Sequence, residues 1–447
     1  MTGSVCDQDH SELVGIAAER DPRRVRVKSR DYFWYSPVLD AELKDKVGDI
    51  VLTPKNEAEV RRIAAFAARH KLPLTVRGGG TGNYGQCVPL KGGIILDITG
   101  INRVIEIKPG LARVEAGCKI QVLEDAAQAT GQALLMWPST KKIATIGGFV
   151  GGGYAGVGSL RHGILKDQGN VTRIRVMTVE ETPRIIELFD SDIQKVHHAY
   201  GTNGIMLDLD VALAPAIDWR HQIIHFSSYA DTLRFGQAAS KPDLDVFLLT
   251  TVERRFKPFY RTLGTHFPDG RDAVFAMVAP QSSQALGALA GDHGGVVSLD
   301  MTEHEVEQAG LPPTYECAYN HTTLQALKVD RGWTYLQVAY PQSIDLTLVE
   351  RQMARFGNEL LMHHEFAKQF GGYQVFALPL VRWSTKERLY EVIRSFEADG
   401  CLVFDPHVFT IEDGGMKEID HAQINFKREA DPHGLMNPGK TRGWPST

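Results

Sequence analysis

The sequence predicts an α+β protein, and three observations support this prediction. Strand-like and helix-like patterns alternate from residue 49 onwards. Two glycine-rich stretches, at residues 78–85 and 147–163, interrupt the alternation. Near residue 215 the glycine density falls, and longer mixed segments rich in aromatic side chains begin. We therefore expect a second domain to start there.

Length and composition exclude several classes of protein. The chain has 447 residues, enough for two or three domains with cores of their own. Its net charge of −5 lacks the basic excess typical of nucleic-acid-binding proteins. No apolar run approaches the roughly 18 residues that cross a bilayer, and the acidic start is unlike a secretory signal. The five cysteines show no zinc-binding spacing. We expect a cytoplasmic protein with no nucleic-acid partner and no transmembrane segment.

The first domain is predicted to begin with a β-α-β unit. Residues 49–53 have the pattern of a strand, and Asn56 with Glu59 three residues later is typical of a helix start. Residues 73–77 predict the next strand, which leads directly into glycines. A helix is expected at residues 119–130, and further strands at residues 93–98, 103–107, 112–116, 171–179 and 205–213.

The first glycine-rich stretch contains a literal G-x-G-x-x-G motif at residues 80–85. A Rossmann-type site requires a helix to begin inside that motif. Here Pro89 and the pair Gly92-Gly93 follow, which a helix interior disfavours, so we reject that interpretation. The remaining prediction is a loop whose main-chain N–H groups converge on phosphate oxygens. A tight structural turn is the alternative.

The second glycine-rich stretch is preceded by hydroxyl side chains, and residues 138–159 are mostly small. Small residues allow a flat ring and a diphosphate to approach the backbone closely. The alternative is a close-packed crossing of chain segments.

Taken together, these motifs resemble the FAD-binding domain of the vanillyl-alcohol oxidase family, also called the PCMH-type domain. The resemblance rests on residues 77–82, 92–97, 114–117, 144–148, 160–163, 201–205 and, at the C-terminal end, 431–440. It implies an FAD domain of two α+β subdomains at residues 46–215 and an α+β cap domain for the substrate at residues 216–400. An N-terminal extension at residues 1–45 would pack on the flavin domain, and residues 401–447 would return to it.

The resemblance also implies which residues hold the cofactor. The pyrophosphate would lie at Gly78, Gly79, Gly80, Thr81 and Gly82, and the ribityl and flavin portion along Ser139, Thr145, Gly147 and Gly148. Ile205 would lie near the adenine. Further residues expected to bind the cofactor are Arg77, Asn83, Gly158 and Ser159. Lys440 could neutralise charge on the reduced flavin, or be only a conventional element of the chain's end.

Two departures from the family pattern refine these expectations. Thr81 stands where many relatives carry the histidine that attaches FAD covalently, so we expect non-covalent FAD. Relatives that act on 2-hydroxy acids often carry a metal-binding histidine cluster in the cap. Here His363 and His364 are adjacent rather than spaced, so no metal is expected.

Candidate catalytic groups come from the need to hold a substrate and accept its hydroxyl proton. Among 16 histidines, His321 and His407 have suggestive surroundings, although each could be structural. Glu316 could orient a histidine or be a surface carboxylate. Tyr340 could anchor a phenol. Arg382 could clamp a carboxylate, or be a solvated cation stacked on Trp383.

The sequence thus predicts an FAD-dependent oxidoreductase that acts on a CH–OH group or a benzylic C–H group. Aromatic side chains in the cap favour a hydroxylated aromatic substrate. One alternative is a glycolate- or D-lactate-like 2-hydroxy-acid dehydrogenase, and another is an FAD-assisted addition or lyase reaction. The electron acceptor (oxygen, a quinone or a redox protein) and a homodimeric state stay open.

Overall fold

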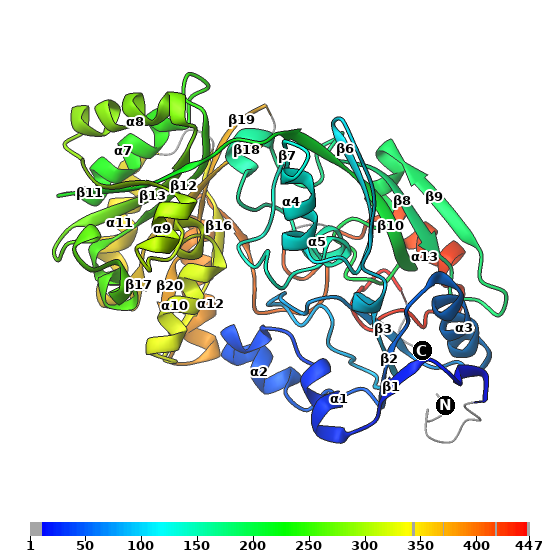
Figure 1. Ribbon diagram of the computed structural model, residues 1–447. Helices are drawn as coiled ribbons and strands as arrows, with labels where there is room; N and C mark the ends of the chain where they lie inside the picture. The colour runs from blue at the N-terminus through cyan, green and yellow to red at the C-terminus, as the bar shows by residue number, and fades with distance from the viewer. Residues whose placement is uncertain (1–10, 342–344, 370, 416–417, 445–447) are drawn as a thin grey trace. The chain divides into compact units, whose positions relative to one another are not determined.

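The computed structural model describes residues 11–341, 345–369, 371–415 and 418–444 (Figure 1). The chain forms two compact units of mixed α and β structure. Unit 1 consists of Met1–Tyr154, Leu165–Ala216 and His407–Thr447. Unit 2 consists of Ala155–Ile164 and Ile217–Pro406. The α+β fold class predicted from the sequence is confirmed.

The first sheet of unit 1 contains the predicted β-α-β unit. Its strand order is β1 (Ala17–Glu19), β2 (Ile50–Thr53), β4 (Ile94–Asp97) and β3 (Leu74–Arg77), with β2 and β3 both parallel to β4. Helix α3 (Glu57–Arg69) begins as predicted, because the Asn56 side chain accepts a hydrogen bond from the Glu59 amide. Val60 and Ile63 of α3 share one buried core with Ile50 and Leu52 of β2.

The second sheet of unit 1 is antiparallel. Its order is β5 (Val104–Lys108), β6 (Leu111–Glu115), β10 (Ile205–Pro215), β8 (Val171–Met177) and β9 (Ile185–Phe189), and β7 (Gln132–Leu134) also pairs with β10. The remaining helices of unit 1 are α1 (Pro22–Lys28), α2 (Pro37–Leu43), α4 (Ile120–Gln128), α5 (Ile146–Gly152) and α13 (His421–Ala430).

Helix α5 is the main departure from the predicted elements. The sequence indicates a flexible glycine-rich stretch there, because glycine disfavours helix interiors. The structure forms a short helix, since Thr145 caps its first turn and the side chains of Ile146, Phe149 and Val150 are buried. Burial of that apolar face overrides the low helix propensity of the glycines.

Unit 2 is built on an eight-stranded antiparallel sheet. Its order is β14 (Val296–Thr302), β11 (Arg220–Phe226), β13 (Asp272–Val278), β12 (Val246–Val252), β18 (His363–Gln369), β19 (Gly372–Ala377), β16 (Gln337–Ala339) and β21 (Leu402–Phe404). A smaller sheet has the order β15 (Trp333–Tyr335), β20 (Leu380–Arg382) and β17 (Leu360–Leu361).

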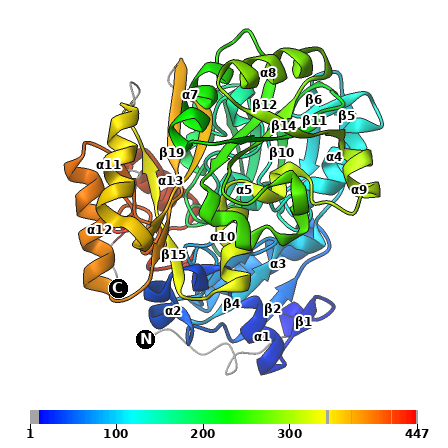
Figure 2. The same ribbon diagram turned by 90° about the vertical axis from the view of Figure 1, so that its left-hand side faces the viewer.

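Helices cover the strands of unit 2. Helices α7 (Tyr229–Ala239) and α8 (Pro280–Asp292) lie side by side (Figure 2). The others are α6 (Ser159–His162), α9 (Glu303–Gln308), α10 (Asn320–Val329), α11 (Leu346–Phe356) and α12 (Lys386–Ala398). Among the described residues, no helix combines the length and apolar character needed to cross a bilayer.

Candidate functional site

The first glycine loop begins where β3 ends, at Arg77. Gly80 has a φ of 65° and Gly85 a φ of 68°, which only glycine adopts without strain. Strand β4, not an α-helix, is the next regular element along the chain. This arrangement agrees with the rejection of a Rossmann-type site, which needs a helix N-terminus inside the motif.

Main-chain donors in this loop are free. Within the described residues, the amide N–H groups of Gly79, Gly80, Thr81 and Gly82 donate no hydrogen bond. The loop is held in place through a carbonyl group, because the Tyr32 amide donates to the Gly82 carbonyl at 2.7 Å. Consecutive free amides in a loop with a positive-φ glycine fit the oxygens of a diphosphate.

The loop is in direct contact with the second glycine-rich stretch. A Cβ atom on Gly78 would lie 2.1 Å from the Thr145 hydroxyl oxygen. A Cβ atom on Gly79 would lie 2.3 Å from the Ile143 carbonyl oxygen. Glycine is therefore required at both positions by close packing, and residues 78–82 are held against residues 143–145.

The second stretch offers side chains rather than main-chain donors. The Gly147 amide donates to the Ala116 carbonyl at 2.9 Å, and the Gly148 amide donates to the Thr145 hydroxyl at 3.2 Å. A Cβ atom on Gly147 would lie 2.7 Å from that of Ala116, so this glycine serves a close-packed crossing. Ser139 is buried nearby in the sequence, before the cap of α5.

The other predicted cofactor residues are divided between the two units. Asn83 is buried in unit 1, and Ile205 is fully buried in the core of that unit at the start of β10. Gly158 and Ser159 belong to unit 2, where the Gly158 amide donates to the Phe247 carbonyl and the Ser159 hydroxyl accepts from the Gly156 amide. The structure gathers the predicted residues from 77 to 83 and from 139 to 148 in unit 1.

Lys440 is fully buried in unit 1, and its Nζ donates to the Gly85 carbonyl at 2.5 Å. Burial lowers the pKa of Lys440 to about 7. Burial also raises the pKa of Asp31 to about 6, although the charges of Lys440 and Arg77 oppose that rise. Sequence reasoning missed Asp31, because it lies about 50 residues before the glycine motif in the printed sequence and belongs to no recognisable pattern.

His321 and Glu316 form a pair in unit 2. Nδ1 of His321, on α10, lies 2.7 Å from Oε2 of Glu316, on the 3₁₀ helix η8 (Thr314–Cys317). Nδ1 is nevertheless buried without a hydrogen bond of acceptable geometry among the described residues, so the contact is a close approach and not an aligned hydrogen bond. Within the described residues, Nε2 of His321 makes no hydrogen bond either. A neighbouring carboxylate can position an imidazole, so the pair is a candidate general base with its positioning residue.

The other predicted catalytic residues are engaged in the structure. His407 is buried in unit 1, with Nδ1 at 2.7 Å from the Ser36 hydroxyl. Tyr340 is buried in unit 2, where its hydroxyl donates to Gln352 at 2.5 Å and burial holds its pKa well above the usual range. Arg382 forms an ion pair with Asp330 on the surface, and its guanidinium lies 5.2 Å from the centre of the Trp333 ring.

The adjacent histidines also lie in unit 2. They are on β18, where neighbouring side chains point to opposite faces. Nε2 of His363 lies 2.7 Å from Oε1 of Glu365, and both side chains are buried. Nδ1 of His364 lies 2.7 Å from the Tyr229 hydroxyl, and burial lowers the pKa of His364 to about 3. Within the described residues, no group of three or more His, Cys, Asp or Glu side chains has the arrangement of a metal site.

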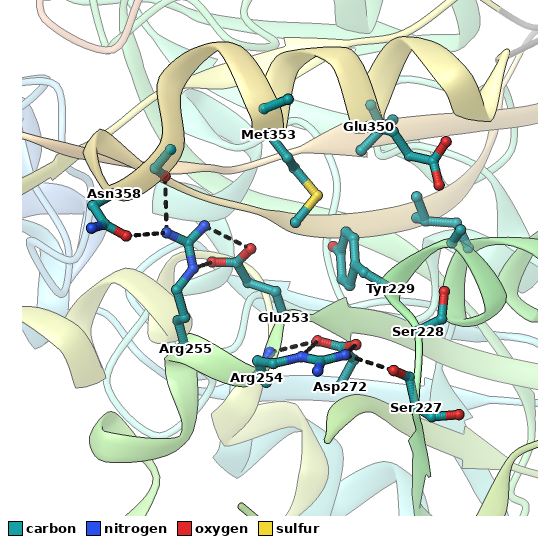
Figure 3. Close-up of a pocket in the computed structure, with 15 residues that line it drawn as sticks. Ser227, Ser228, Tyr229, Glu253, Arg254, Arg255, Asp272, Glu350, Met353 and Asn358 are labelled. Carbon is teal, nitrogen blue, oxygen red and sulfur yellow. Dashed lines mark hydrogen bonds and ion pairs between the residues drawn. The ribbon is translucent and has the colours of Figure 1, made fainter. Parts of the chain in front are cut away.

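Unit 2 contains a cavity of about 650 Å³ between the start of α7, the end of β12 and helix α11 (Figure 3). Four of its charged side chains form two ion pairs. Arg254 holds the Asp272 carboxylate, and Arg255 holds the Glu253 carboxylate. None of the residues predicted to be catalytic or cofactor-binding lines this cavity.

Comparison with known proteins matches residues 48–185 to the model of the FAD binding domain family. The glycolate oxidase subunit GlcD of Bacillus subtilis is 31% identical over 121 residues, which are 27% of this chain and 26% of the relative. D-2-hydroxyglutarate dehydrogenase of Escherichia coli is 38% identical over 134 residues, which are 29% of this chain and 13% of the relative. These alignments therefore span about a quarter or less of the curated relatives.

Solved structures share the fold over nearly the whole chain. An alkyldihydroxyacetonephosphate synthase superposes with a TM-score of 0.72 at 12% identity, covering 95% of this chain and 82% of that one. A Physcomitrella patens BBE-like 1 variant gives a TM-score of 0.67 at 11% identity, covering 96% of this chain and 97% of that one.

Proposed function

Because this chain belongs to the FAD-linked oxidoreductases with a PCMH-type FAD-binding domain, we propose that unit 1 binds FAD non-covalently and that unit 2 binds the substrate. The reaction would remove a hydride from a hydroxylated small molecule. The main support is that two independent observations point to the same segment. The amides of Gly79–Gly82 are free, and these residues lie within residues 48–185, which match the FAD binding domain.

The loop of unit 1 would hold the diphosphate through the amides of Gly79, Gly80, Thr81 and Gly82. Thr81 has a hydroxyl where covalent attachment would need a nucleophilic imidazole, which supports non-covalent binding. When bound, FAD supplies a hydride acceptor. The chain's own residues must then bind the substrate and remove its hydroxyl proton.

In this proposal His321 of unit 2 accepts the hydroxyl proton on Nε2, while Glu316 acts as a positioning residue at Nδ1. The substrate C–H bond breaks with its electron pair, the O–H bond loses its proton to His321, and a carbonyl forms. The proposal assigns no step to His407, Tyr340 and Arg382, each of which contacts another side chain through one polar atom: Ser36, Gln352 and Asp330 respectively.

For the substrate class we favour a 2-hydroxy acid over an aromatic alcohol. Relatives with significant similarity are named glycolate oxidase subunit, D-lactate dehydrogenase and D-2-hydroxyglutarate dehydrogenase. An aromatic alcohol is the alternative. Its support is weaker, because several of the aromatic side chains that suggested it are buried in the core of unit 2, among them Tyr315, Tyr335 and Tyr340.

The test is the visible flavin spectrum of the purified protein, recorded without oxygen while 2-hydroxy acids and phenolic alcohols are added. Bleaching of the oxidised-flavin band by a 2-hydroxy acid supports the proposal. Bleaching only by phenolic alcohols supports the aromatic alternative. A yellow protein that neither class bleaches contradicts the hydride-transfer proposal, and a colourless protein that takes up no FAD contradicts cofactor binding.

A further inference from the structure

A cluster of three buried charged side chains lies under the first glycine loop of unit 1. We call Asp31, Arg77 and Lys440 the buried charge cluster. The three come from separate parts of the sequence: the N-terminal segment, the end of β3 and the C-terminal segment. Their exposed fractions are 5%, 8% and 0%. Charges are rarely buried without a partner, so their collection at this loop calls for a role.

Each member of the cluster touches the loop. The guanidinium of Arg77 packs against Gly80, where a Cβ atom would lie 2.1 Å from Nη2. Nζ of Lys440 donates to the Gly85 carbonyl at 2.5 Å. Oδ2 of Asp31 is 3.8 Å from the position of a Cβ on Gly82. These contacts put one carboxylate and two cations beside the segment whose amides are free.

Asp31 is incompletely partnered. Oδ1 accepts from the Phe33 amide at 2.9 Å, but Oδ2 is buried and has no hydrogen-bond partner among the described residues. A buried carboxylate oxygen without a partner is costly when the group is ionised. A carboxylate next to a diphosphate site is also repelled by the ligand.

Protonation of the cluster therefore changes within the ordinary pH range. Burial raises the pKa of Asp31 to about 6 and lowers the pKa of Lys440 to about 7. The other titratable or charged groups that act on the cluster or on its immediate neighbours are Arg77, Cys87, Tyr84, Tyr200 and Glu412. Burial raises the pKa of Cys87 to about 11 and the pKa of Tyr200 further still, so both stay neutral near pH 7.

We propose that the buried charge cluster couples dinucleotide binding to protonation, so that the diphosphate binds best when Asp31 is neutral and Lys440 is charged. This proposal rests on the proposed FAD site. At acidic pH the cluster carries two positive charges, on Arg77 and Lys440. At alkaline pH Lys440 is neutral and the negative Asp31 cancels Arg77, so the net charge is zero.

The direction of the coupling follows from these charges. A bound diphosphate stabilises the protonated form of both groups, so binding takes up protons and raises both pKa values. FAD affinity should accordingly fall as the pH rises through about 6 to 7. If FAD binding raises either pKa by one unit, the affinity for FAD changes about tenfold between acidic and alkaline pH.

Two substitutions separate this charge effect from a merely structural one. Asp31→Asn removes the negative charge and should increase FAD affinity at alkaline pH while leaving it nearly unchanged at acidic pH. Lys440→Met removes the positive charge and should decrease affinity at acidic pH while leaving it nearly unchanged at alkaline pH. Each variant flattens the pH profile, but from the opposite end. Asp210→Asn is the matched control, since Asp210 is a buried carboxylate of unit 1 paired with Arg113 on β6.

The experiment is a fluorescence titration of the full-length, flavin-depleted protein with FAD at about pH 5.5, 7.0 and 8.5, with proton uptake measured by calorimetry in two buffers. Wild type and Asp210→Asn should lose about tenfold or more in affinity from the lowest to the highest pH. Two results would overturn the coupling while leaving the FAD site intact. One is a loss of FAD affinity that is the same at every pH in Asp31→Asn and Lys440→Met. The other is a wild-type FAD affinity that does not depend on pH. Failure of the wild type to bind FAD at any pH would instead overturn the proposed function.

Discussion

At the scale of single residues, Gly79 of the first glycine loop has no room for a side chain. A Cβ atom there would lie 2.3 Å from the Ile143 carbonyl oxygen and 2.9 Å from its carbon, and both are backbone atoms. Gly79→Ala should therefore displace the loop and its free amides. Overpacking of this kind costs about 1–3 kcal/mol, or roughly 5- to 150-fold in FAD affinity if the loop bears the whole cost.

A fluorescence titration with FAD checks this prediction, and Gly291→Ala is its control. Gly291 lies on α8 of unit 2, where a Cβ atom would meet no atom within 4 Å. Unchanged FAD affinity in Gly79→Ala would show that the loop does not hold the diphosphate.

The second residue-scale prediction concerns His321. If Nε2 of His321 accepts the substrate proton, His321→Gln should slow flavin reduction by about 10²- to 10⁴-fold. Glu316→Gln should cause a smaller loss, because the carboxylate beside Nδ1 acts only by positioning the imidazole. Anaerobic stopped-flow measurement of the flavin band gives both rates.

His304→Gln provides a matched control for that measurement. His304 is an exposed histidine of α9, and its Nε2 contacts Gln308. A reduction rate in His321→Gln equal to that of His304→Gln would exclude His321 as the base.

At the scale of elements, the start of α5 is held by one hydroxyl. Thr145 accepts the Gly148 amide at 3.2 Å, and the same hydroxyl packs against Gly78 of the first loop. Thr145→Ala should cost about 0.5–2 kcal/mol of stability and should also weaken FAD binding. Thr302→Ala removes the same kind of cap from α9 in unit 2 and should lower stability alone. Urea unfolding and FAD titration of both variants test this, and equal FAD affinities would contradict it.

The elements that the sequence predicted well have strong local signals. The β-α-β unit was predictable because Asn56 caps α3 and its apolar residues recur at helical spacing. Helix α5 was not, since its glycines indicate a loop and its stability depends on burial of Ile146, Phe149 and Val150. Such tertiary burial leaves no local pattern in a seven-residue segment.

At the scale of the whole molecule, the geometry of the first glycine loop was predictable because a continuous motif encodes it. The loop at residues 78–82 follows directly from the motif after β3. The role of Asp31 could not be predicted from the sequence, because only the folded chain brings it beside Arg77 and Lys440. The pair of His363 and Glu365 was missed for a similar reason: the alternation of β18 puts them on one face, whereas the sequence drew attention to His363 and His364.

Stability of the whole molecule should depend on one buried carboxylate of unit 2. Glu253 is 2% exposed, and burial raises its pKa from 4.5 to about 7, although Arg255 opposes the rise. Between about pH 4.5 and 7 the Glu253 carboxyl is protonated in the folded protein but ionised in the unfolded chain. Its contribution to the free energy of unfolding is therefore complete below about pH 4.5 and is lost as the pH rises through 7. The shift corresponds to about 3 kcal/mol. Glu253→Gln cannot ionise, so its free energy of unfolding should fall by about 2.5 kcal/mol less than that of wild type between pH 5 and pH 8. Urea unfolding at both pH values measures this difference. Asp31 makes the same pH-dependent contribution to the stability of both proteins, so it cancels.

Glu359→Gln is the control, because Glu359 is paired with Arg388 but is only partly buried. The same pH dependence in wild type and Glu253→Gln would show that Glu253 is already ionised throughout this range.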